Sequence, residues 1–313
     1  MQDWWALEKL WQKHCDPAHQ EVVHDIKLWH QQLKALYANH LAYPAVIKFL
    51  LEVRPNLPEF KDWLQQMRDA YQILESAEQA ADADADDNLT QEQIDFWHKN
   101  GYLVLSNAID AKACAASRDA IWRFLNADIN DPTSWYRAQH LQQGLMLPFY
   151  NHPQLNTNRA SKRIRTAFEQ LYGTKAIYKT IDQTSFNPPE TNNFSFRGNG
   201  LHWDVSLTLP IPERYQGLLY LSDCDEMDGA FHCVPGFHHQ ITPWLEQLAP
   251  HEDPRECALR DLQAKAVTGK AGDFIIWHQA LPHCATANRG KTPRMVQYLA
   301  YIPDDHVDQS VWR

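Results

Sequence analysis

The chain lacks the cysteine pairs, the positive charge and the long apolar runs that mark three large classes of protein. Its six cysteines form no C-x-x-C pair and no regular framework, which is typical of a reducing compartment. The net charge of −10 argues against general nucleic-acid binding. No segment approaches the ~20 apolar residues of a membrane span, and the first residues lack the basic start of a signal peptide. We therefore expect a cytoplasmic protein without nucleic-acid or membrane partners.

The first 80 residues carry the pattern of a helical region. Ile26, Trp29 and Leu33 recur at helical spacing, so they share one face. Pro44 and Pro58 stand where the first turns of two helices would begin. We predict that this region is a packing layer on the rest of the protein, with a dimer interface or a wall over the active site as alternatives.

A change of pattern divides the chain near residue 85. The segment 77–88 is acidic and of low complexity, as in a linker or a solvated helix end. Thr90 and Gln93 then form a capping box that begins another helix. From about residue 101, short β runs alternate with turns. The sequence thus predicts a helical region over 1–85 and a second, mainly β domain over 86–313.

Two histidines and one aspartate carry the clearest chemical signal. His202 and Asp204 stand in "LHWDVSL", and His283 stands far downstream. Alternate strand residues face the same side, so a strand would present His202 and Asp204 together. With sixteen histidines in the chain, such a pair alone is more often a surface or core pair than a pair of metal ligands. Two imidazoles and a carboxylate, however, are the facial triad that binds Fe(II) and leaves positions for a cosubstrate and O₂.

An arginine follows the distal histidine. "GLHWDVSLTL", Phe274 to Trp277, and the run 294–302 are predicted strands, and "NRGKTP" supplies a turn between the last two. His283 would lie near the end of one strand and Arg294 at the start of the next, as neighbours across a hairpin. A guanidinium pairs a carboxylate bidentately, so Arg294 is predicted to hold the distal carboxylate of 2-oxoglutarate.

Four stretches in the same order resemble the phytanoyl-CoA dioxygenase family of Fe(II)/2-oxoglutarate oxygenases. They are "NLTQEQIDFWHKNGYLVLSNAID" (88–110), "LHWD", "LSDCDEMDGAFHCVPGFHH" (221–239) and "KAGDFIIWHQALPHCATANRGKTPRMVQY". The resemblance covers about residues 88–303. It implies an α+β fold with a double-stranded β-helix core of the jelly-roll, cupin-like type. It also implies iron on His202, Asp204 and His283, and 2-oxoglutarate on Arg294.

The chain departs from the family pattern at two positions. The family often has serine two residues after the distal histidine; here Ala285 stands there, and Thr286, the next residue, could supply the hydroxyl. The lysine often found before the family's double proline is Asn187. Halogenases of the family typically have Gly or Ala where this chain has Asp204, so Asp204 favours hydroxylation or a related oxidation.

Three further residues are weaker candidates. Tyr220 in "GLLYLSD" could donate a hydrogen bond to 2-oxoglutarate, or it could be a core tyrosine. Arg197 in "FSFRGNG" could hold a substrate carboxylate, or it could be an exposed loop arginine. Trp203 could border the substrate, although a structural role is the alternative.

We predict an Fe(II)- and 2-oxoglutarate-dependent dioxygenase. It would use O₂ to hydroxylate an unactivated C–H bond of a small organic molecule, with release of succinate and CO₂. Desaturation, cyclisation or epoxidation at the same site is the first alternative. A non-catalytic binding protein and a cupin-like metalloenzyme without 2-oxoglutarate are remoter alternatives, and Arg294 argues against both.

Overall fold

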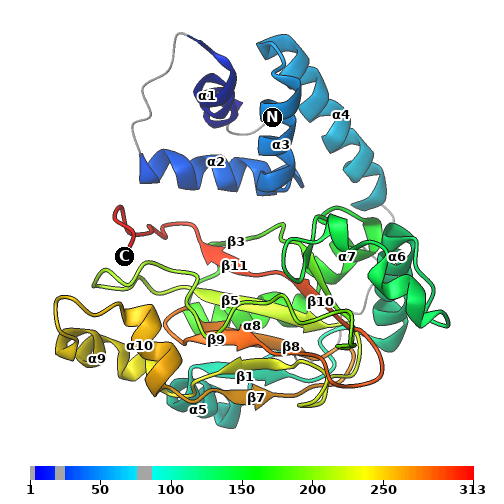
Figure 1. The fold of residues 1–313 in the computed structure, drawn as a ribbon. Helices are drawn as coiled ribbons and strands as arrows, with labels where there is room; N and C mark the ends of the chain where they lie inside the picture. Colours follow the sequence, from blue (N-terminus) through cyan, green and yellow to red (C-terminus); the bar gives the residue numbers. More distant parts are fainter. Residues whose placement is uncertain (1–3, 18–24, 76–86) are drawn as a thin grey trace.

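The computed structural model describes residues 4–17, 25–75 and 87–313. Figure 1 shows a helical region stacked on a larger part built of sheets and helices. The predicted boundary near residue 85 lies outside the described residues and stays a prediction. The first part contains α1 (Trp4–Cys15), α2 (Ile26–Ala38), α3 (Tyr43–Val53) and α4 (Leu57–Glu75).

The four helices of the first part share a core of their own, as their apolar stripes predict. Leu7 and Leu10 of α1 meet Leu36 of α2 and Leu50 of α3 in one buried cluster. Pro44 lies in the first turn of α3, where its missing N–H costs no hydrogen bond. The helical character of this region is therefore confirmed.

A six-stranded antiparallel sheet forms the centre of the second part. Its strand order is β1-β8-β5-β10-β4-β2. The strands are β1 (Tyr102–Leu105), β2 (Met146–Leu147), β4 (Thr184–Asn187), β5 (Tyr215–Tyr220), β8 (Phe274–His278) and β10 (Arg294–Tyr298). A smaller sheet pairs β3 (Ile177–Lys179) with β11 (Tyr301–Pro303).

A three-stranded sheet faces the large one. Its order is β7-β6-β9, from β6 (Phe231–Cys233), β7 (Lys265–Val267) and β9 (His283–Ala285). Leu218 and Ile275 of the large sheet share a buried cluster with Phe231 and Val267 of the small one. Apolar side chains therefore fill the space between two antiparallel sheets, and the predicted jelly-roll core is confirmed.

Helices cover the outer face of the large sheet. Phe274 and Met295 point away from the sandwich and pack with residues of α5 (Gln91–Asn100), α6 (Ala111–Leu125) and α8 (Lys162–Tyr172). The predicted capping box of Thr90 and Gln93 begins α5. The remaining helices are α7 (Pro153–Arg159), α9 (Ile241–Gln247) and α10 (Pro254–Asp261). Within the described ranges, no helix combines the length and the apolar character needed to cross a membrane.

Two predictions of local structure are wrong. The segment 200–209 is not a regular strand, because it makes one isolated antiparallel bridge, from His202 to His283. His283 and Arg294 are not hairpin neighbours either. The chain turns at 279–282, and Pro282, which has no N–H to donate, precedes β9. His283 therefore begins a strand of the small sheet, whereas Arg294 lies in the large sheet between β5 and β4.

Candidate active site

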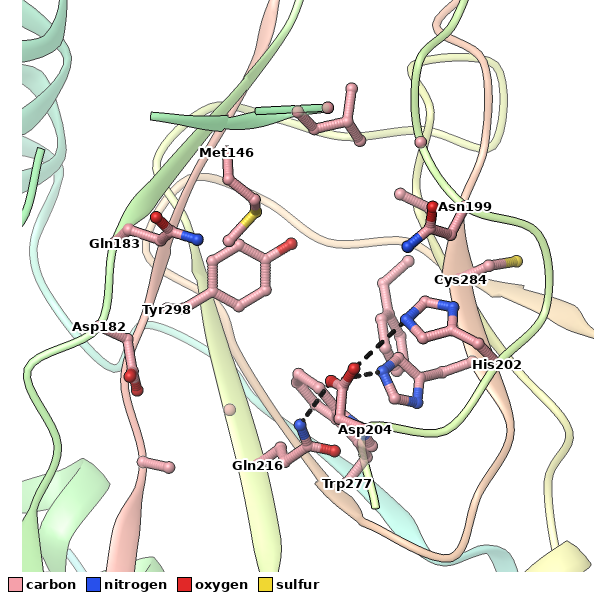
Figure 2. A pocket seen from close by; sticks show the side chains of 18 of the residues that line it. Met146, Asp182, Gln183, Asn199, His202, Asp204, Gln216, Trp277, Cys284 and Tyr298 are labelled. Atoms are coloured by element: carbon pink, nitrogen blue, oxygen red, sulfur yellow. Dashed lines mark hydrogen bonds and ion pairs between the residues drawn. The ribbon is translucent and has the colours of Figure 1, made fainter. Parts of the chain in front are cut away.

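His202, Asp204 and His283 converge at one point between the two sheets. Each offers one ligand atom, and these atoms all lie within 4.8 Å of one another. The His202 Nε2 lies 3.5 Å from Asp204 Oδ1, and the His283 Nε2 lies 3.3 Å from Asp204 Oδ2. Figure 2 shows the ring of His202 pointing toward the carboxylate of Asp204. This is the grouping that the sequence predicts.

The main chain brings these side chains together. The His202 amide donates to the His283 carbonyl at 3.0 Å, and the His283 amide donates to the His202 carbonyl at 2.9 Å. Residues 202 to 204 keep the alternation of an extended chain even though they form no regular strand. Trp203 is buried in the core, with an exposed fraction of 2%, whereas the side chain of Asp204 is 51% exposed, toward the cavity.

Both imidazoles have the ring orientation that metal binding requires. The Nδ1 atom of His202 lies 2.7 Å from the Gly200 carbonyl, and that of His283 lies 3.1 Å from the Leu281 carbonyl. A carbonyl oxygen only accepts, so each Nδ1 carries a proton, and each Nε2 is the nitrogen that could bind a metal after losing its own proton. The Nε2 atoms are the ones that face Asp204.

Asp204 is held as a carboxylate. The partial loss of water around it would raise its pKa, but hydrogen bonds from His202 and His283 outweigh that effect and hold the pKa well below its usual range. Gln216 of β5 adds a hydrogen bond from its amide nitrogen to Asp204 Oδ2, at 2.8 Å. Burial lowers the pKa of His202, but its hydrogen bond with Asp204 more than compensates, so the pKa is raised. The carboxylate is therefore ionised and oriented at neutral pH.

A cavity of about 650 Å³ opens beside these three residues. Arg294 of β10 also lines it. His283 and Arg294 therefore border the same cavity from different sheets, although they are not hairpin neighbours. Figure 2 shows Asp182, Gln183, Met146 and Tyr298 across the cavity from Asp204. The other polar residues that line it are Gln143, Arg197, Asn199, Arg214 and Gln216.

Arg294 is a buried cation with unused donors. Its exposed fraction is 1%, and its Nη1 donates to the Gly229 carbonyl. The Nε and Nη2 atoms have no hydrogen-bond partner among the described residues. Because a buried guanidinium normally fills its donors, the arrangement fits an anionic ligand in the cavity. The predicted position for a 2-oxoglutarate carboxylate is thus chemically suited to one.

The structure does not support the predicted roles of Tyr220 and Trp203. The Tyr220 hydroxyl gives its proton to the Val267 carbonyl at 2.8 Å, and burial raises its pKa above the usual range. The Trp203 indole donates to the Ala280 carbonyl at 2.9 Å. Neither residue lines the cavity. Both are core residues, the alternative that the sequence left open.

The other predicted residues lie at the edge of the site. Arg197 lines the cavity and donates to Gln139 at 2.7 Å, so its role in substrate binding stays a prediction. Ala285 lines the cavity, but Thr286 does not, and the Thr286 carbonyl accepts a hydrogen bond from Asn187. A replacement hydroxyl from Thr286 is a prediction that this geometry does not favour.

The sequence does not predict four residues that line the cavity: Asp182, Arg214, Gln216 and Tyr298. Arg214 directly precedes β5 and Gln216 is the second residue of that strand. They are two residues apart, which is the spacing that puts His202 and Asp204 on one side. That spacing was the available signal, but no chemical pattern distinguishes these residues from ordinary polar strand positions.

Comparison with known proteins identifies the class. The sequence model of the phytanoyl-CoA dioxygenase (PhyH) family matches residues 97–296, and the chain belongs to this family. It is a non-haem iron dioxygenase that uses Fe(II), 2-oxoglutarate and O₂. A Dictyostelium discoideum protein named as a phytanoyl-CoA dioxygenase is 22% identical over 68% of this chain and 76% of its own.

Two further proteins illustrate the range of the similarity. The ectoine dioxygenase of Bordetella bronchiseptica is 22% identical, over 69% of this chain and 76% of that protein. The fold is shared with HygX of Streptomyces hygroscopicus, solved with nickel and 2-oxoglutarate. The TM-score is 0.50 and the identity 18%, over 72% of this chain and 90% of HygX. At such identities the solved structure supports the fold alone.

Proposed function

We propose that the enzyme hydroxylates an unactivated C–H bond of a small organic molecule, with iron on His202, Asp204 and His283 and 2-oxoglutarate on Arg294. Bound iron supplies the oxidising chemistry from O₂ as the keto acid is converted to succinate and CO₂. The protein holds the ligands, orients the cosubstrate and encloses the reacting C–H bond.

The triad supports the iron part of the proposal by its donor set. Two neutral imidazoles and one carboxylate suit Fe(II) and leave adjacent coordination positions for a chelating keto acid and O₂. The Nδ1 contacts of both histidines and the Gln216 contact of Asp204 already fix the ligand orientations.

The single observation that carries the 2-oxoglutarate assignment is that the buried guanidinium of Arg294 has unpaired hydrogen-bond donors among the described residues. Its guanidinium is buried in the wall of the triad's cavity, and two of its nitrogen atoms have no partner among the described residues. A dicarboxylate that spans from the iron to Arg294 would satisfy them. A metalloenzyme without such a cosubstrate would leave a buried cation uncompensated.

The cavity supports a small substrate. Its volume of about 650 Å³ lies within the range of small-molecule sites, and the cosubstrate would take a part of it. Its lining is rich in amide and charged groups, which suits a polar molecule. The relatives named for ectoine and phytanoyl-CoA act on small organic molecules, and this similarity supports the same class here.

The test is a screen of small molecules for oxygen-dependent stimulation of succinate release, followed by product analysis under ¹⁸O₂. Hydroxylation predicts a product that gains one oxygen atom from O₂. A product that loses two hydrogens without gaining oxygen would replace hydroxylation by desaturation or cyclisation. Gain of oxygen at a double bond would indicate epoxidation. Absence of succinate release in every condition would refute the proposal.

A further inference from the structure

Arg214 is one of the three arginines in the wall of the active-site cavity, with Arg197 and Arg294. It stands directly before β5, two residues before Gln216, which hydrogen-bonds Asp204. Side chains two residues apart in an extended chain lie on one side, separated by about 6.6 Å. Arg214 therefore lies within the length of a small molecule from the metal ligands, on the same side of the strand.

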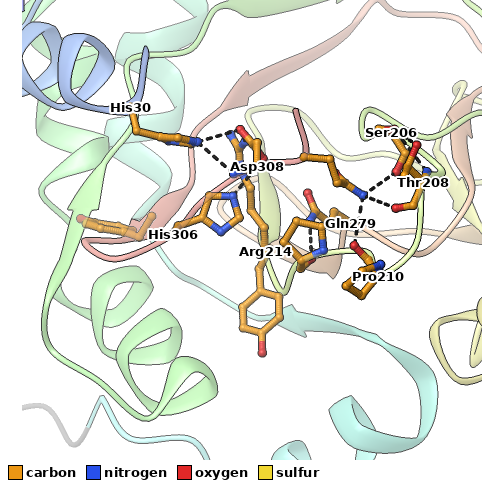
Figure 3. Close-up of polar contacts among 12 residues, drawn as sticks. His30, Ser206, Thr208, Pro210, Arg214, Gln279, His306 and Asp308 are labelled. Atoms are coloured by element: carbon orange, nitrogen blue, oxygen red, sulfur yellow. Dashed lines mark hydrogen bonds and ion pairs between the residues drawn. The ribbon is translucent and has the colours of Figure 1, made fainter. Parts of the chain in front are cut away.

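Figure 3 shows Arg214 beside a cluster of three residues, His30, His306 and Asp308. The Nη1 of Arg214 lies 3.6 Å from Asp308 Oδ2. Asp308 in turn contacts two imidazoles: His306 Nε2 lies 2.9 Å from its Oδ1, and His30 Nε2 lies 3.1 Å from its Oδ2. His30 belongs to α2 of the helical region, so this cluster joins that region to the cavity wall.

Asp308 is within ion-pair distance of Arg214 but does not saturate it. At 3.6 Å the contact exceeds hydrogen-bond length, while the carboxylate oxygens lie closer to the ring nitrogens of His306 and His30, at 2.9 and 3.1 Å. The Nε atom of Arg214 is buried and has no partner in the part of the chain that the structure describes. The guanidinium is thus positioned by an ion pair but keeps donors for a ligand.

The same three residues could be taken for a second metal site, because their ligand atoms also lie within 4.8 Å of one another. The guanidinium of Arg214 stands beside one of the carboxylate oxygens that would bind such an ion, and its charge would repel a cation. The backbone N–H of Asp308 also points at His30 Nε2, at 3.1 Å. The cluster is therefore better suited to position Arg214.

The other charged side chains of the cavity already have a partner or an assigned role, so Arg214 is the group available to bind an anion. Arg294 is assigned to 2-oxoglutarate by the proposed function. Arg197 is exposed and its guanidinium donates to Gln139. Asp182, the carboxylate that lines the cavity besides Asp204, accepts a hydrogen bond from the Thr180 hydroxyl.

We propose that Arg214 binds an anionic group of the substrate, a carboxylate or another oxyanion, and that α2 positions this arginine through His30 and Asp308. The inference rests on the proposed function and names its substrate class. It also gives the helical region a role: α2 supports the substrate side of the cavity, and Lys34 adds a 2.9 Å ion pair to Asp304 on the same C-terminal segment.

The test measures the binding of matched acids and amides to the full-length protein loaded with Zn(II) and saturating 2-oxoglutarate, which occupies Arg294. The probes are benzoate and benzamide, hexanoate and hexanamide, and L-proline and L-prolinamide. Ligand-observed NMR measures the affinity of each probe. The wild type should bind the acids more tightly than the amides. Arg214→Gln should weaken acid binding about tenfold or more and leave amide binding unchanged, because it removes a charge-assisted pair.

Two other variants make the test specific. Arg197→Gln removes the exposed arginine of the same cavity and should change the preference for acids much less. Asp308→Asn should reduce that preference several-fold without changing amide binding. A general loss of folded structure would weaken the binding of acids and amides alike and would leave the ratio of the two affinities unchanged. Equal binding of acids and amides by the wild type, or loss of the preference in Arg197→Gln alone, would overturn the role of Arg214. An unchanged preference in Asp308→Asn would overturn the role of α2.

The charge-transfer absorption of Fe(II) with 2-oxoglutarate, recorded on the wild type, keeps this inference distinct from the proposed function. An absorption band without any preference for acids would refute the anion site alone. A preference for acids that depends on Arg214 without the band would refute the oxygenase assignment and leave the anion site supported.

Discussion

His202 and His283 exchange both of their backbone hydrogen bonds, at 3.0 and 2.9 Å, although they are far apart in the sequence. This bridge sets their ring centroids 4.8 Å apart and places both Nε2 atoms against Asp204. A metal bound there would tie the segment of His202 to the small sheet. Metal binding is therefore expected to stabilise the fold as well as to support catalysis.

The first prediction concerns that stabilisation. Ni(II), used as an inert substitute for iron at about 100 times its dissociation constant, should stabilise the protein by about 2.7 kcal/mol. Asp204→Ala should lose the stabilisation, because it removes the carboxylate ligand that lies between the two histidines. Thermal denaturation with and without metal, and again after a chelator, measures this. An equal rise in the Asp204→Ala variant would place the metal elsewhere.

The second prediction concerns Gln216. Its amide nitrogen orients Asp204 at 2.8 Å, so Gln216→Leu should lower the iron affinity roughly 10- to 100-fold without removing a ligand. Gln183→Leu is the matched control, since Gln183 lines the cavity and no hydrogen bond joins it to Asp204. Competition with a metal-sensitive chelator gives both affinities. Equal affinities in the two variants would show that Gln216 does not support the ligand.

The third prediction concerns Arg294. Arg294→Lys keeps the positive charge but loses the planar fork, so the KM for 2-oxoglutarate should rise about tenfold or more. Arg294→Gln should raise it further, whereas iron affinity should change little in both. Succinate release at varied 2-oxoglutarate concentration gives the KM. An unchanged KM in both variants would require another carboxylate-binding group.

The fourth prediction concerns acid sensitivity. Burial lowers the pKa of His278 from 6.5 to about 4, and burial, together with the charge of His239, lowers that of His238 to about 4. The unfolded chain binds these protons at higher pH than the folded chain does. The stability contribution of the neutral rings is thus complete above about pH 6.5 and is lost as the pH falls toward about 4.

The measurement is the thermal midpoint between about pH 7 and pH 4.5. His278→Asn, which keeps a side-chain acceptor for the Ala280 amide, should show a smaller decrease than the wild type. His251→Gln, a change at an exposed histidine, is the control and should behave like the wild type. The same decrease in all three proteins would show that His278 does not cause it.

The sequence was sufficient where a local rule decides the position. His202 and Asp204 face one side because an extended chain alternates, and this holds although their segment is not a regular strand. The prediction that His283 and Arg294 are hairpin neighbours is wrong because Pro282 and the turn before it carry the chain to the other sheet. That pairing depends on contacts between residues far apart in the sequence. Arg214 and Gln216 were missed for the same reason: their importance depends on Asp308 and Asp204, which only the fold brings to them.

The most direct test of the account is an anaerobic titration of the metal-free protein with Fe(II) and 2-oxoglutarate, followed by visible charge-transfer absorption. We expect a band that requires both additions, disappears in Asp204→Ala and weakens in Arg294→Ala. Bound iron without a band in the wild type, at saturating 2-oxoglutarate, would contradict the claim that this one cavity holds the metal and the cosubstrate together.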